Sequence, residues 1–301
     1  MKKKNKIIIF SEFSKKKGFG HYVRSRRLFD HIKNKLKIKY YLNKNKNFIK
    51  KISKHSNCDK TLFIFDLKNY KKYHILKNNN PVIYFDNKIK FGRNSININP
   101  LFPSYGKFSG PKWHSYPKDF FFDKVTKKKK LVKNILICQG GTDPHNNIIK
   151  LVKNIKNKIN DLDLKLNILL PKNYVFNEKL KKNFSIKLYK NVNKLSSFLS
   201  NFDHIITACG NLAYEINFLG INCTYVTREK RESYLARYLK KKGFGNFFYN
   251  PSDKKLKKHI YEQLLLPNQT NKKLKIKKIR YFRHNGLMNI EKLILKLLNE
   301  I

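Results

Sequence analysis

A loop with two glycines, a histidine and an arginine follows the first apolar segment of the chain, residues 6–10. Gly18 and Gly20 allow the backbone to bend sharply and to approach a ligand closely. His21 begins a predicted helix, where free N–H groups and the helix dipole favour an anion, and its imidazole can move a proton near neutral pH. Arg24 follows one helical turn later. We expect His21 to be catalytic and Gly18, Gly20 and Arg24 to bind substrate; the alternative is that His21 only caps the helix.

The glycine spacing of this loop argues against a nicotinamide cofactor. A dinucleotide fingerprint needs a third glycine at position 23, where this chain has Val23. The sequence also contains no P-loop, no serine-hydrolase elbow and no HExxH zinc motif. Its four cysteines form no CxxC pair. We therefore expect no cofactor and no metal.

A second glycine-rich loop follows the predicted strand 134–139. Gly140 and Gly141 come directly after this strand, and Thr142 and Asp143 precede a predicted helix. Such a loop can hold a phosphate or a sugar through its backbone N–H groups. The alternative is an ordinary turn in which Asp143 caps the helix. All four residues are candidates for substrate binding.

A third loop follows the predicted strand 203–208. Gly210 and Asn211 open a helix whose first turn is expected to contain Glu215. A carboxylate at this position can accept hydrogen bonds from both hydroxyls of a ribose. The alternative is that the helix dipole alone stabilises Glu215 there. We take Gly210, Asn211 and Glu215 as further substrate-binding candidates.

Strand-like and helix-like segments alternate along almost the whole chain. This alternation predicts an α/β fold with parallel sheets and helices on both faces. Ligands of such sheets bind at the carboxyl ends of the strands, which is where the three loops lie. The expected strands are 6–10, 38–42, 61–67, 81–86, 95–99, 134–139, 164–170, 185–188, 203–208 and 222–227.

One stretch interrupts the alternation and marks a domain boundary. Residues 100–118 are rich in proline and glycine, and a lysine run follows at 127–130. The chain is long enough for two domains. We therefore predict two Rossmann-like domains, 1–125 and 126–301.

The net charge is large and positive, at +49 from 68 Lys and Arg against 19 Asp and Glu. Nearly all of the excess is lysine spread along the chain, which indicates a solvated surface more than a specific nucleic-acid site. This charge raises non-specific affinity for polyanions and allows peripheral contact with an acidic membrane surface. No apolar run reaches the about 20 residues of a spanning helix. The expected location is the cytoplasm, and the oligomeric state stays open.

Three segments together resemble a known family: GFGHYVRSRRL at 18–28, CQGGTDP at 138–144 and ACGNLAYEINFLGIN at 208–222. They are similar to the UDP-sugar hydrolase of pseudaminic acid biosynthesis, which cleaves UDP from UDP-2,4-diacetamido-2,4,6-trideoxy-β-L-altropyranose. The strand ends at Asp66 and Asp86 agree with this resemblance. The wider group includes spore-coat polysaccharide proteins and the lipid-linked N-acetylglucosaminyltransferase of peptidoglycan synthesis. The resemblance implies a GT-B-like fold, in which two Rossmann-like domains face each other across a cleft.

The resemblance also implies roles for the matching residues. His21 would orient or deprotonate the water that attacks the sugar, in a first domain on the sugar and acceptor side. The Gly140–Gly141 loop and the helix near Gly210 would hold the pyrophosphate and uridine, and Glu215 would bind the ribose. Two other functions stay open: a glycosyltransferase that uses a UDP-sugar donor, and a non-catalytic polyanion-binding protein.

One departure from the family concerns the segment after the strand 222–227. The family often has Asn-Gln there, which helps to hold the phosphate or the sugar. This chain has Arg-Glu-Lys-Arg-Glu at 228–232. Arg228 or Arg231 would neutralise phosphate instead, and the resemblance therefore leaves the sugar unnamed.

Overall fold

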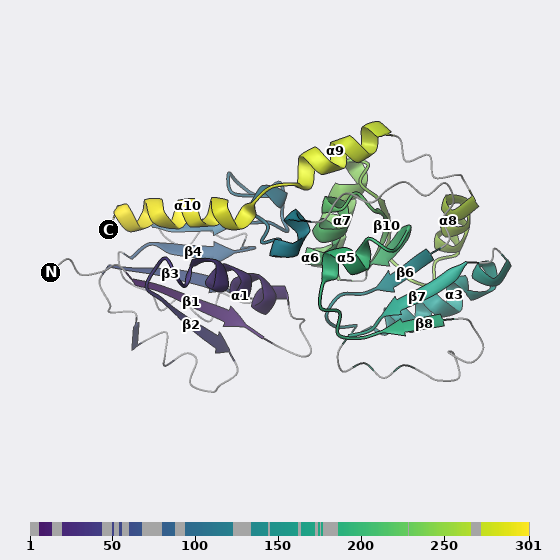
Figure 1. Cartoon of the computed structure of the whole chain (residues 1–301), viewed down its shortest axis with the longest axis horizontal. Coiled ribbons are helices and arrows are strands. Elements are labelled where there is room, and N and C mark those ends of the chain that lie inside the picture. The colour runs from purple at the N-terminus through teal and green to yellow at the C-terminus, as the bar shows by residue number, and fades with distance from the viewer. Residues whose placement is uncertain are drawn as a thin grey trace. The chain divides into compact units, whose positions relative to one another are not determined.

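The chain forms two compact units in the computed structural model (Figure 1). Unit 1 contains Met1–Tyr116 and His284–Ile301, and unit 2 contains Pro117–Arg283. The structure describes residues 6–13, 20–43, 50, 54–55, 60–67, 80–87, 94–122, 134–143, 145–161, 164–171, 174, 176, 186–227, 229–265 and 272–300.

Unit 1 is built on a five-stranded sheet in which every described pairing is parallel. The order of the strands is β2-β1-β3-β4-β5. The chain thus turns back at β1, and the carboxyl ends of β1 and β3 form the switch point at which ligands of such sheets bind. The strands are β1 (Lys6–Glu12), β2 (Ile38–Asn43), β3 (Thr61–Asp66), β4 (Val82–Phe85) and β5 (Ser95–Ile98).

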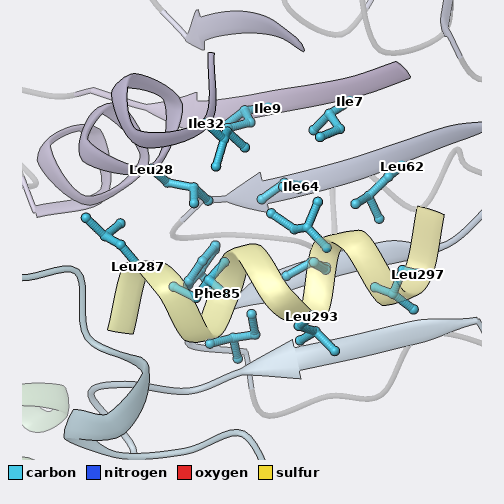
Figure 2. Close-up of a cluster of buried hydrophobic side chains, with 14 of the residues drawn as sticks. Ile7, Ile9, Leu28, Ile32, Leu62, Ile64, Phe85, Leu287, Leu293 and Leu297 are labelled. Carbon is cyan, nitrogen blue, oxygen red and sulfur yellow. The ribbon is translucent and has the colours of Figure 1, made fainter. Parts of the chain in front are cut away.

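Two helices from opposite ends of the chain, α1 (Gly20–Ile32) and α10 (Gly286–Asn299), pack on one face of this sheet (Figure 2). The strands are apolar on both faces, as expected for a parallel sheet that is covered on both sides. Helix α10 contributes an apolar stripe at helical spacing. The buried residues of this stripe are Leu287, Ile290, Leu293, Ile294, Leu297 and Leu298.

The first residue of α10 approaches the backbone of unit 1 very closely. A Cβ atom on Gly286 would lie 2.0 Å from the carbonyl oxygen of His114. His114 follows the short helix η2 (Pro111–Trp113), whose Trp113 belongs to the same apolar cluster as α10. Because only glycine lacks a Cβ atom, this close approach depends on Gly286.

Unit 2 is built on a six-stranded parallel sheet in the order β11-β10-β9-β6-β7-β8. Its switch point lies between β6 and β9, which are neighbours in the sheet but far apart in the chain. The strands are β6 (Asn134–Cys138), β7 (Lys165–Leu169), β8 (Ile186–Tyr189), β9 (His204–Thr207), β10 (Asn222–Val226) and β11 (Asn246–Phe248). The helices are α3 (Asn147–Asp161), α5 (Leu195–Leu199), α6 (Asn211–Phe218), α7 (Lys230–Lys241), α8 (Lys254–Leu265) and α9 (Lys272–Phe282), with the short η3 (Lys118–Phe121) at the start of the unit.

The predicted α/β architecture with two parallel sheets is therefore confirmed. The boundaries of the units differ from the predicted ranges 1–125 and 126–301 at both ends of unit 2. The chain leaves unit 1 after Tyr116 and returns to it at His284, because the apolar stripe of α10 is buried against the strands of unit 1. An amphipathic pattern shows that a helix packs, but not on which sheet.

We expect Gly286→Ala to destabilise unit 1, because the added methyl group would overlap the His114 carbonyl. Overpacking of this kind costs about 1–3 kcal/mol. Urea unfolding followed by tryptophan fluorescence measures this, because the only tryptophan of the chain, Trp113, lies in the apolar cluster of unit 1. Met288→Ala, at an exposed position of the same helix, should change the unfolding free energy by less than about 0.5 kcal/mol. Equal stability of both variants would contradict this account of the contact.

Candidate active site

The strand order of unit 1 brings the first predicted loop to its switch point. His21 is the second residue of α1, which follows β1, and Asp66 is the last residue of the neighbouring strand β3. Gly20 is the first residue of α1. Gly18 lies outside the described residues, and its predicted contact with substrate stays a prediction.

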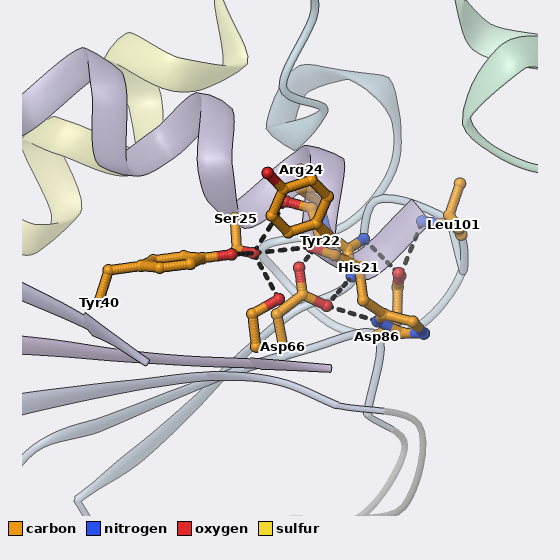
Figure 3. A network of polar contacts seen from close by, with 9 residues as sticks. His21, Tyr22, Arg24, Ser25, Tyr40, Asp66, Asp86 and Leu101 are labelled. Atoms are coloured by element: carbon orange, nitrogen blue, oxygen red, sulfur yellow. Dashed lines mark hydrogen bonds and ion pairs between the residues drawn. The ribbon is translucent and has the colours of Figure 1, made fainter. Parts of the chain in front are cut away.

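His21 and Asp66 form a hydrogen-bonded pair (Figure 3). The distance from His21 Nδ1 to Asp66 Oδ1 is 2.6 Å, and the Asp66 side chain is fully buried whereas that of His21 is 13% exposed. A carboxylate at Nδ1 favours the tautomer with its proton on Nδ1, which leaves Nε2 as a proton acceptor. The pair therefore has the arrangement of an oriented general base.

Arg24 binds both oxygens of the same carboxylate (Figure 3). Its Nε donates to Asp66 Oδ2 at 2.8 Å and its Nη2 donates to Asp66 Oδ1 at 2.5 Å, while Nη1 donates to Asp86 Oδ2. The side chain is 2% exposed because Arg24 continues the buried stripe of α1, which includes Leu28 and Ile32. Its guanidinium is occupied by two carboxylates, and this burial does not favour the predicted contact with substrate.

Asp86 follows β4 in a left-handed backbone conformation, with a φ of 50°. This conformation is uncommon for a residue with a side chain. The Asp86 carboxylate accepts from Arg24 and from the backbone N–H of Leu101 at 2.9 Å. These bonds hold the loops after β4 and β5 beside the His21–Asp66 pair.

The charges around Asp66 keep its carboxylate ionised. Burial alone would raise the pKa of Asp66, but the charge of Arg24 and the hydrogen bonds from Arg24 and His21 lower it to about 2. Burial likewise opposes the charge of Arg24, and the charges of Asp66 and Asp86 outweigh it and raise the pKa of the guanidinium. Asp66 is therefore a permanent anion next to His21 at neutral pH. The sequence marks Asp66 and Asp86 as strand ends, but no local signal in it indicates their role.

In unit 2, the second and third predicted loops also lie at the switch point. The last residues of β6 and β9, Cys138 and Thr207, are paired across the sheet, so the loops that follow them begin side by side. Gly140 has a φ of 83°, and no atom lies within 4 Å of the position that a Cβ would occupy. Gly141 is exposed and Thr142 is partly buried.

Asp143 caps helix α3. Its two carboxylate oxygens accept from the N–H groups of Asn147 and Ile148, each at 2.8 Å. The ordinary-turn alternative thus describes Asp143 correctly, and the start of α3 already has its own anion.

Helix α6 begins differently. Its N-cap residue is Gly210, and no side chain of the described residues caps it. Asn211 is the first helical residue, as expected, and Glu215 is the fifth. The expectation that Glu215 lies in the first turn was wrong, because a turn holds only 3.6 residues. Glu215 is 4% exposed. Burial, with a smaller contribution from the charge of Glu215, raises the pKa of Cys138 at the end of β6 to about 12.

The segment that departs from the family pattern carries glutamates at the same edge of the sheet. Glu232 Oε2 accepts from Thr227 Oγ1 at 2.5 Å, and its Oε1 lies 3.8 Å from the Cβ position of Gly210. Glu229 Oε1 lies 2.9 Å from His145 Nε2, and both of these side chains are exposed. Burial raises the pKa of Glu232. The start of α6 therefore has a carboxylate as its neighbour, and Arg228 lies outside the described residues.

Neither a metal cluster nor a membrane span is found in the described ranges. No group of three or more His, Cys, Asp or Glu side chains there could hold a metal ion. No helix among the described residues is long and apolar enough to cross a membrane.

Comparison with solved structures identifies the fold. The glycotransferase of kitacinnamycin has a TM-score of 0.68 and 13% identity, covering 98% of this chain and 100% of that one. MurG of Acinetobacter baumannii has a TM-score of 0.64 and 15% identity, over 97% and 99% of the two chains. The spinosyn rhamnosyltransferase SpnG, complexed with thymidine diphosphate, has a TM-score of 0.63 and 11% identity, over 96% and 99%. The GT-B-like fold predicted from the sequence is confirmed.

Sequence comparison adds one relative. Uncharacterized protein MJ1062 of Methanocaldococcus jannaschii is 34% identical over 149 residues, which are 44% of this chain and 30% of that protein. The match spans less than a third of the length of this relative. No protein-family model matches the chain.

The low pKa of Asp66 predicts a specific loss of stability in acid. Because the folded-state pKa of about 2 lies below the ordinary value of 3.8, the carboxylate stabilises the fold above about pH 4 and loses this effect as the pH falls towards 2. We expect Asp66→Asn to be less stable than wild type at pH 6, and the difference to shrink by about 2–3 kcal/mol by pH 2. Urea unfolding at several pH values measures it.

The matched control is Asp30→Asn in α1 of the same unit, whose carboxylate is exposed and binds Arg26 and Lys33. Its effect should stay below about 1 kcal/mol at every pH. A difference between wild type and Asp66→Asn that does not change with pH would contradict the assigned ionisation.

Proposed function

We propose that the chain is an enzyme that releases UDP from a UDP-linked sugar, with water as the acceptor. The observation that carries this proposal is the His21–Asp66 pair at the switch point of unit 1, in a fold shared with glycosyltransferases. The three sequence segments that resemble the pseudaminic acid hydrolase support water as the acceptor and a diacetamido-trideoxy sugar as the donor group.

In this reaction His21 acts as the general base. Nε2 takes a proton from the water as its oxygen bonds to the anomeric carbon, and the bond from that carbon to the phosphate oxygen breaks. Asp66 stabilises the imidazolium that forms, because it stays ionised and accepts from Nδ1. Arg24 and Asp86 hold Asp66 in place and do not touch the reacting atoms.

UDP leaves with the electron pair of the broken bond, and unit 2 supplies the groups that stabilise it. The start of α6, which lacks a side-chain cap among the described residues, offers backbone N–H groups to the diphosphate. Glu215 accepts hydrogen bonds from the ribose hydroxyls. The start of α3 is a poorer phosphate site because Asp143 occupies it.

A glycosyltransferase is the second candidate, since the solved structures of this fold named above include transferases. The same base would then deprotonate a carbohydrate hydroxyl. Release of UDP from a panel of UDP-sugars without added acceptor separates the two functions. Release into water supports the hydrolase, and UDP binding without release supports the transferase. Absence of UDP binding, with salt-dependent binding of nucleic acid, would instead support the polyanion-binding alternative.

We expect His21→Ala to lower the rate of UDP release by about 10²–10⁴-fold, the usual contribution of a general base. UDP affinity should change little, because His21 acts on the nucleophile and not on the nucleotide. A coupled assay for UDP and calorimetric titration with UDP measure the two effects. His31→Ala, on the same helix, should keep the wild-type rate, because His31 binds Glu291 of α10. Full activity of His21→Ala would refute the catalytic assignment.

We expect Glu215→Ala to weaken UDP binding by about 1–3 kcal/mol, the cost of losing hydrogen bonds to a charged group. The affinity for 2′,3′-dideoxy-UDP should not change, because that nucleotide lacks the hydroxyls that Glu215 would bind. Titration of both nucleotides into both proteins tests the assignment. An equal loss for the two nucleotides would mean that Glu215 supports the loop and does not bind ribose.

A further inference from the structure

Two buried amide side chains lie at the two ends of the loop between β6 and α3. Gln139 follows β6 and is 5% exposed, and Asn147 begins α3 and is 6% exposed. Asn147 Nδ2 donates to Gln139 Oε1 at 3.5 Å, the only hydrogen bond that the structure gives between these amides. The pair therefore lies directly beside Gly140 and Gly141.

This pair has unused hydrogen-bonding capacity. Gln139 Nε2 and Asn147 Oδ1 are buried and have no hydrogen-bond partner within the part of the chain that the structure describes. Turning both amides over only exchanges the atoms that are left, because one hydrogen bond between two amides always leaves one amino group and one carbonyl. Buried polar groups without partners are rare in folded proteins, and each one needs an explanation.

A matched amide in the same sheet shows the usual situation. Asn167 of β7 is also 5% exposed, but its Nδ2 donates to the carbonyls of Ile135 and Lys165, and its Oδ1 accepts from Tyr189. Asn167 therefore stabilises the sheet through its own partners. Gln139 and Asn147 do not have such partners.

The chemistry of the unused groups selects the ligand. A phosphate oxygen only accepts hydrogen bonds, so it cannot satisfy the Asn147 carbonyl, and the Asp143 carboxylate at the start of α3 repels it. A hydroxyl or an amide both donates and accepts. The backbone next to the pair is open at Gly140, where no atom lies within 4 Å of the Cβ position.

We infer that Gln139 and Asn147 form a subsite for a neutral hydroxyl or acetamido group of the donor sugar. This inference rests on the proposed function and gives the β6–α3 loop a role in selecting the sugar.

The test uses Gln139→Met, which keeps the length of the side chain and removes its polar atoms. All proteins carry His21→Ala so that the donor is not consumed. Calorimetric titration compares UDP, UDP-N-acetylglucosamine, UDP-glucose and the diacetamido-trideoxy altrose donor. We expect at least a tenfold loss of affinity for the sugar donors and less than a twofold change for UDP. A loss confined to donors with acetamido groups assigns the acetamido, and a loss that includes UDP-glucose assigns a hydroxyl.

Stability provides the second readout. Gln139→Met should change the melting temperature little, because it removes one long hydrogen bond of 3.5 Å, whereas Asn167→Leu should lower it, because Asn167 loses three hydrogen bonds. If Gln139→Met fails to fold, Asn147→Leu tests the other half of the pair with the same ligands.

Three results would overturn the inference. They are an equal loss for UDP and the sugar donors, no loss for any ligand, and a parent protein that binds UDP as tightly as every sugar donor. A parent that binds no nucleotide at all would refute the proposed function, and this subsite with it. Unchanged nucleotide-sugar binding in Gln139→Met would refute the subsite alone.

Discussion

Two carboxylates lie at one buried edge of unit 1, where Asp66 and Asp86 follow neighbouring strands. Buried like charges repel strongly, and removing a carboxylate from water costs several kcal/mol, so two carboxylates at this edge need a cation between them. Arg24 is that cation, and its planar guanidinium reaches both carboxylates at once. The helix that carries Arg24 also carries His21, and the same interaction therefore sets the position of the base.

The backbone of Asp86 bears part of this constraint. A left-handed residue with a side chain costs free energy, and it persists only where the surroundings determine it. Here the hydrogen bonds from Arg24 and from the backbone N–H of Leu101 hold Asp86 in this conformation. Backbone strain of this kind is typical of functional sites. Here it accompanies bonds that fix the Asp86 carboxylate in one position beside the His21–Asp66 pair.

The strands other than the short β11 (Asn246–Phe248), and the three loops, could be predicted from the sequence, because apolar runs and glycine positions are local signals. The contacts between residues far apart in the sequence could not be predicted. Nothing near Arg24 in the sequence shows that it binds the ends of two later strands. The sequence also does not distinguish a buried arginine from an exposed one. Asp143 shows the same limit, since a capping aspartate and a ligand-binding aspartate occupy the same place before a helix. The start of α6 at Gly210 and Asn211 was predicted correctly, but Glu215, as the fifth helical residue, lies past the first turn.

The return of the chain to unit 1 at His284 has a consequence for biosynthesis. Unit 2 is continuous in sequence, and all of its residues are synthesised before α10. Unit 1 instead waits for its last helix, and until then the apolar face that α10 covers is open to water and to other chains. Domains fold as units during synthesis, from the N-terminus onward, and exposed apolar surface in a partly folded chain promotes aggregation. In this protein the unit that begins first is completed last, and the sheet that is synthesised first keeps one apolar face uncovered for longest.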